Sequence, residues 1–193
     1  MRRSSKVHVS VAALFLLAAG SALAADKAIA TYQCFAANMQ RGRSSVINIH
    51  INRWSTDEER ESLLTTLQEF GQDKLLDALM KIRPPVGYMR TPNSIGYDLY
   101  YARKQPQPDG GHRVVAATNR RVAFGEAASN TRSMQYQFTL IEIHIDKDGK
   151  GEGKMVPAAK VSWDKDAKKL EIENYNALPI SLINVKETTP KAK

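Results

Sequence analysis

From residue 86 onward, apolar side chains recur at every second position of the chain. In IGYDLYYAR, for example, Ile95, Tyr97, Leu99 and Tyr101 share one parity. Successive side chains of a β-strand point to opposite faces, so this period predicts strands with one buried face. We therefore expect the tyrosines near position 100 to be core residues of a sheet rather than a recognition surface.

Glycine-containing turns divide this region into antiparallel hairpins. QPDGG precedes the apolar run HRVVAAT, and a second turn is expected near Asp148 and Gly149 within FTLIEIHIDKDGKGEGKM. The apolar parity changes between Tyr136 and Ile145, which predicts either a one-residue bulge near Leu140 or a strand buried on both faces. Three more strands are expected, at 158–163, 170–174 and 180–185.

The segment before residue 86 combines one strand with two helices. Isoleucines alternate with polar residues over Val46–Trp54. Ser55 and Glu58 have the spacing of a capping box, which predicts a helix beginning there. Gly71 is expected to end that helix and Pro84 the next one. The predicted fold class is α+β, with a two-helix hairpin packed on a bent, mainly antiparallel sheet of about six or seven strands.

The first 24 residues have the three-part layout of a secretory signal peptide. Three basic residues precede an apolar run of about a dozen residues, and small residues follow at 22–24. This run is shorter than the roughly 20 residues that a membrane-spanning helix needs. We predict a signal peptide over 1–24, no membrane span after its cleavage, and export to the periplasm or the cell exterior. Residues 25–193 suit one domain, with a short disordered basic tail at about 188–193.

Patterns that indicate catalysis or metal binding are weak. Cys34 is the only cysteine, so no intrachain disulfide can form. The glycine-rich DGKGEGKM lacks the hydroxyl residue and the following helix of a phosphate-binding loop. His50 and His144 are weak candidates for a metal site, because no spacing places two histidines on one element. No serine lies in a GxSxG elbow, and we predict no catalytic residue, no metal and no cofactor.

The chain is basic, with a net charge of +8 that falls to +5 when the three basic residues of the signal peptide are removed. The predicted second helix, QDKLLDALMK, has as many acidic as basic residues, unlike a helix that reads nucleic acid. We therefore predict no nucleic-acid partner. The positive charge suits a partner such as an anionic component of the cell envelope, or a small ligand.

Several longer segments resemble a family of uncharacterised exported bacterial proteins. They extend from Trp54 to Lys186 and read RWSTDEER, VGYMRTPNSIGYDLYYAR, PDGGHRVV, GEGKM and ENYNALPISLINVK. The resemblance implies export from a bacterial cell and a single domain. It implies no activity and no site.

These observations favour a non-catalytic binding or interaction module of the periplasm or cell exterior. Loop residues and hydrogen-bonding groups are dense near the ends of the run that begins the sheet region. The predicted ligand-binding residues are Arg90, Asn93, Tyr100 and Arg103.

Two alternatives stay open. A curved sheet can enclose a small lipid-like or aromatic ligand, in which case Tyr97 and Tyr101 would line the pocket. A secreted hydrolase would instead assemble its active site from distant residues. That reading requires His50, His112 or His144 within hydrogen-bond reach of a hydroxyl or carboxylate inside a cleft.

Overall fold

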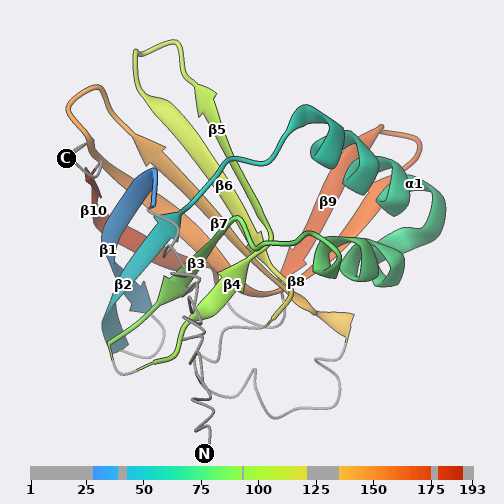
Figure 1. The fold of residues 1–193 in the computed structure, drawn as a ribbon, viewed down its shortest axis with the longest axis horizontal. Coiled ribbons are helices and arrows are strands. Elements are labelled where there is room, and N and C mark those ends of the chain that lie inside the picture. Colours follow the sequence, from blue (N-terminus) through green and yellow to red (C-terminus); the bar gives the residue numbers. More distant parts are fainter. Residues whose placement is uncertain (1–27, 39–42, 93, 121–134, 175–177, 189–193) are drawn as a thin grey trace, which may run out of the picture.

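The computed structural model describes residues 28–38, 43–92, 94–120, 135–174 and 178–188, and within them it has one helix and ten strands (Figure 1). The predicted signal peptide and the tail beyond residue 188 lie outside the described residues. In chain order the elements are β1 (Ala30–Asn38), β2 (Arg43–Ile51), α1 (Asp57–Met80), β3 (Gly87–Arg90), β4 (Tyr97–Leu99), β5 (Tyr101–Pro106), β6 (His112–Thr118), β7 (Phe138–Ile145), β8 (Lys150–Asp164), β9 (Lys169–Asn174) and β10 (Ile180–Thr188).

The strands form one antiparallel sheet that curls into a nearly closed barrel. Its order is β4-β3-β2-β1-β10-β8-β7-β6-β5, and β9 pairs with the far end of β8. Closure comes from the run Tyr97–Pro106, whose first part pairs with β3 and whose second part pairs with β6. Between the two parts, the amide of Tyr100 donates to the carbonyl of Ala117 at 3.0 Å. One continuous stretch of chain therefore lies at both edges of the sheet.

The predicted α+β class is wrong, because the protein is mainly β. The sheet has ten strands instead of six or seven, and the first of them had no clear sequence signal. In β1 the inward residues are Tyr32, Cys34 and Ala36, and the two small ones give a weak apolar pattern. Two further strands, β3 and β4, are only four and three residues long. Within the described part of the chain, no helix combines the length and the apolar character that a membrane crossing requires.

The two predicted helices form one element, α1, that is kinked between them at Gly71. Gly71 has a positive φ of 78°, as expected, but its ψ of −173° lies outside the left-handed helical region and the helix resumes after it. The helix therefore bends sharply at this residue (Figure 1). The bend places Gln72 beside the exposed edge of β8, where its side chain accepts a hydrogen bond from the amide of Val161 at 3.0 Å.

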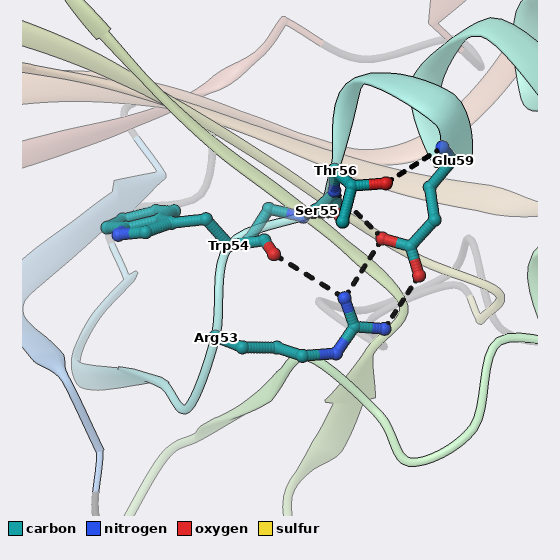
Figure 2. Close-up of polar contacts among 6 residues, drawn as sticks. Arg53, Trp54, Ser55, Thr56 and Glu59 are labelled. Atoms are coloured by element: carbon teal, nitrogen blue, oxygen red, sulfur yellow. Dashed lines mark hydrogen bonds and ion pairs between the residues drawn. The ribbon is translucent and has the colours of Figure 1, made fainter.

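The helix begins one residue later than predicted. Thr56 is the N-cap, and the amide of Glu59 donates to its Oγ1 at 3.1 Å while the amide of Thr56 donates to the Glu59 carboxylate at 3.0 Å (Figure 2). Arg53 donates to both oxygens of the same carboxylate, at 2.9 and 2.8 Å. Ser55 cannot serve as the cap because its Oγ accepts the amide hydrogen of Ala102 on β5.

Buried residues form two clusters on opposite faces of the sheet. The inner core fills the barrel, and the outer core lies between α1 and the outer face of β7 and β8. Leu99 belongs to the inner core, whereas Tyr100 and Tyr101 both belong to the outer core. The predicted alternation therefore breaks at Tyr100, which lies between two strands, and Tyr101 does not share a face with Leu99. Ile95, expected to face the core, is fully exposed.

The parity change in β7 arises from burial on both faces. Ile141 and Ile143 point into the barrel, while Phe138 and Leu140 contact the outer core on the other face. A bulge is present but lies in the partner strand. The two-residue step from Phe138 to Leu140 in β7 is paired with a three-residue step, from Ala159 to Val156, in β8. Beyond the bulge, the alternation of inward-facing and outward-facing side chains in β8 is reversed, and the far half of the strand therefore packs against α1.

Candidate anion-binding site

The predicted ligand-binding residues lie in different surroundings. Arg90 is exposed at the end of β3 and lies over the ring of Tyr88, with 5.4 Å between the guanidinium carbon and the ring centroid. Tyr100 is only 5% exposed and belongs to the outer core. Arg103 forms an ion pair of 2.5 Å with Asp57 at the start of α1. Asn93 lies outside the described residues.

The two histidines weighed as metal ligands are far apart in the sheet. His50 on β2 stacks on Tyr88 with ring centroids 4.6 Å apart, and His144 on β7 contacts Glu142 at 2.9 Å. Three strands, β1, β10 and β8, separate β2 from β7. Among the described residues, no group of three or more His, Cys, Asp or Glu side chains is arranged to hold a metal ion.

A polar cluster, here called the Glu187 cluster, crosses one end of the barrel. It consists of Glu187 on β10, Tyr32 on β1, Lys104 on β5 and His112 on β6. One oxygen of Glu187 accepts the Tyr32 hydroxyl at 3.0 Å and lies 3.3 Å from the Lys104 ammonium, and the other lies 3.2 Å from Nε2 of His112. The carboxylate therefore joins strands from opposite sides of the sheet.

The Glu187 cluster contains residue types that act in acid–base catalysis, but its histidine is not accessible to a substrate. Burial raises the pKa of Tyr32, and the neighbouring Glu187 carboxylate raises it further, so the phenol stays a hydrogen-bond donor. Burial lowers the pKa of His112 more than Glu187 raises it, so its imidazole is neutral at pH 7. Nε2 of His112 has essentially no solvent-exposed surface. A substrate cannot reach this atom directly, so the Glu187 cluster is a poor candidate for the active site that the hydrolase alternative requires.

The two tyrosines expected to line the pocket of a small-ligand carrier do not lie together. Tyr97 packs against the inner core and Tyr101 against the outer core, so the sheet lies between them and they cannot line one cavity. Cys34 is also buried in the barrel, and burial raises the pKa of its thiol to about 12. The thiol is therefore protonated at neutral pH and is a poor nucleophile.

The outer face of the barrel carries a groove where β10 is bulged. β10 has one extra residue relative to β8 between Leu182 and Val185, and relative to β1 between Ile183 and Lys186. Asn184, which lies in both intervals, has a φ of 52°. A bulge bends its strand and disrupts the local pairing. The resulting groove, here called the β10 groove, has a volume of about 340 Å³. The side chains that line its outer side belong to Gln33, Phe35, Lys150, Asn184 and Lys186.

The groove lies at one end of a row of cationic and amide side chains, here called the cationic row. The row runs across five neighbouring strands, because each member is the direct partner of the next. From β3 to β8 its members are Arg90, Asn48, Gln33, Lys186 and Lys150. Neighbouring strands lie about 4.8 Å apart, so the row spans roughly 19 Å. It contains three cations and no carboxylate.

Lys186 and Lys150 form a like-charged pair at the groove end of the cationic row. Both side chains are exposed and directly opposite in the β10–β8 ladder. Neither has an ion-pair partner among the residues that the structure describes. Like charges directly opposite each other destabilise a sheet. An anion bound between the two ammonium groups would remove this repulsion, and the arrangement therefore suits anion binding.

Sequence reasoning found one end of this row and missed the other. Arg90 was among the predicted residues, but Lys150 was placed only in a predicted turn, and Lys186 follows the last predicted strand, 180–185. Nothing local marks them as partners, because their 36-residue separation is bridged only by the pairing of β8 with β10. No protein-family model matches the chain, and no curated protein or solved structure matches it. The resemblance to exported bacterial proteins stays a prediction.

Proposed function

We propose that this protein is an exported, non-catalytic binding module that holds an anionic ligand on the outer face of β1, β10 and β8. The observation that carries the proposal is the direct pairing of Lys186 with Lys150 beside a groove. Filling of the barrel by the inner core supports an external site over an enclosed one. The basic composition and the predicted signal peptide are consistent with a ligand from the cell envelope.

The test measures binding of a compact anion to the purified protein. Tripolyphosphate, titrated by calorimetry, should bind at low ionic strength and bind more weakly as salt is added, because exposed charges are screened. Changing Lys150 and Lys186 together to Gln should weaken binding by about 2- to 30-fold, because the loss of two exposed charge pairs at roughly 0.2–1 kcal/mol each amounts to about 0.4–2 kcal/mol.

The matched control is Lys154→Gln, which removes an exposed lysine from the same outer face of β8 outside the groove. Measured in about 0.1 M salt, it should leave tripolyphosphate affinity within about twofold of the unchanged protein, because Lys154 lies four residues, roughly 13 Å, from Lys150 along β8 and thus beyond the Debye length of about 10 Å. Equal losses in the control and in the double variant would show that binding follows net charge alone. That result would contradict a site at the β10 groove.

A further inference from the structure

We propose, building on the anion-binding function above, that the ligand of the β10 groove is a single amphiphilic molecule with an anionic headgroup and one apolar chain or ring. The headgroup would lie between Lys150 and Lys186. The apolar part would lie on Phe35 and Ile183.

An apolar pair adjoins the two lysines on the same outer face. Phe35 on β1 and Ile183 on β10 are direct cross-strand partners, and they are 46% and 43% exposed. The next outward pair along these strands is Gln33 with Lys186. A ligand that touches both pairs would cover apolar surface that is otherwise in water, which favours binding in proportion to the area buried. A plain inorganic anion leaves that surface exposed.

The β10 groove has the size of a small molecule. Its 340 Å³ equals the volume of about eleven water molecules at roughly 30 Å³ each, so it suits a ligand of about a dozen non-hydrogen atoms. A concave site of this size fits a monomeric amphiphile better than the flat surface of a bilayer. We therefore assign the groove to free amphiphile rather than to lipid within a membrane.

The charges around the groove select the sign of the headgroup. Lys150 and Lys186 line it. Glu152, the next outward residue of β8, is exposed and makes no ion pair among the described residues. Its carboxylate opposes anion binding, so the change Glu152→Gln should strengthen binding. A cationic amphiphile would meet two ammonium groups and should bind weakly.

The experiment compares three small probes by calorimetry on the purified protein. Decanoate has the proposed headgroup and chain, acetate has the headgroup alone, and decyltrimethylammonium has the chain with the opposite charge. Decanoate should bind at least tenfold more tightly than acetate and more tightly than decyltrimethylammonium. Phe35→Ser should weaken decanoate binding about tenfold and leave tripolyphosphate binding unchanged.

Ile183→Ser provides a second variant in case the first one folds poorly, and circular dichroism checks both. If decanoate binds no better than acetate while tripolyphosphate still requires the two lysines, the amphiphile assignment fails and the anion-binding function stands. If neither anion depends on the lysines, both fail. Binding to phosphatidylglycerol vesicles without binding of monomeric decanoate would assign the face to a membrane. A dimer that Phe35→Ser disrupts would assign it to a second copy of the chain. Either outcome overturns the amphiphile proposal.

Discussion

Glu59 connects the start of α1 to the loop that leaves the barrel, and replacing it by Ala should destabilise the protein by about 2 kcal/mol. The carboxylate accepts the amide hydrogen of Thr56 and two hydrogen bonds from the Arg53 guanidinium (Figure 2). Loss of the hydrogen bond from the Thr56 amide to the carboxylate costs about 1 kcal/mol. The paired ions are about one-third and one-quarter exposed, so the ion pair contributes about 1 kcal/mol, the upper end of the range for surface pairs.

Urea denaturation followed by circular dichroism measures this loss. For a chain of 193 residues, 2 kcal/mol corresponds to a fall in Tm of about 4–8 °C. The control is Glu61→Ala, an exposed position in the same helix with the same change in helix propensity. It should change the free energy of unfolding by less than about 0.5 kcal/mol. Equal destabilisation by the two variants would refute the argument, because the cap and the ion pair would then contribute nothing.

The pH dependence gives the same prediction a second readout. The hydrogen bond from Arg53, together with that from the amide of Thr56, lowers the pKa of Glu59 below the ordinary value of 4.5, although burial opposes them. A carboxyl group with a lowered folded pKa stabilises the protein fully above the unfolded pKa and loses this effect as the pH falls through the folded pKa. The difference between the unchanged protein and Glu59→Ala should therefore be constant above about pH 5 and shrink below pH 4.5.

Two further predictions concern the helix bend and the barrel interior. Gly71→Ala should destabilise the protein by about 1–3 kcal/mol, measured by urea denaturation, because the backbone angles φ 78° and ψ −173° suit only glycine. This loss is expected although Ala favours helices. A gain in stability would show that the bend can straighten. His112→Gln should make the free energy of unfolding less dependent on pH between 5.5 and 7.5. Burial lowers the pKa of His112 below 6.5 in the folded protein. The unfolded state therefore binds the proton more readily, and the unchanged protein loses stability as the pH falls below 6.5. Equal pH dependence of the free energy of unfolding in the variant and in the unchanged protein would contradict this assignment.

Local patterns in the sequence were sufficient for most of the strands and turns. The strand HRVVAAT corresponds to β6, and a glycine with positive φ lies at each of the two predicted turns, Gly110 and Gly149. The hairpins β5–β6 and β7–β8 were predicted correctly. These features depend on neighbours in the chain, since hydrophobic alternation and turn chemistry act over a few residues.

The helix start shows where local information becomes ambiguous. Ser55 with Glu58 and Thr56 with Glu59 both match the capping-box spacing. The choice depends on Ala102 of β5, because its amide donates a hydrogen bond to the Ser55 hydroxyl, which is then not used to cap the helix. A residue 47 positions away in the chain therefore decides where α1 begins.

The sequence alone determined which segments are extended, where the chain turns, and that one helical region with a glycine near its centre follows the strand that ends near residue 51 and comes before the later strands. Only the tertiary structure decided that the sheet closes into a barrel, that Tyr100 and Tyr101 pack outside it, and that Lys150 meets Lys186. The physical reason is that strand order and register come from backbone pairing between distant segments and from the packing of two faces at once. Neither the pairing of distant strands nor the packing of both faces can be recognised from the local spacing of residues.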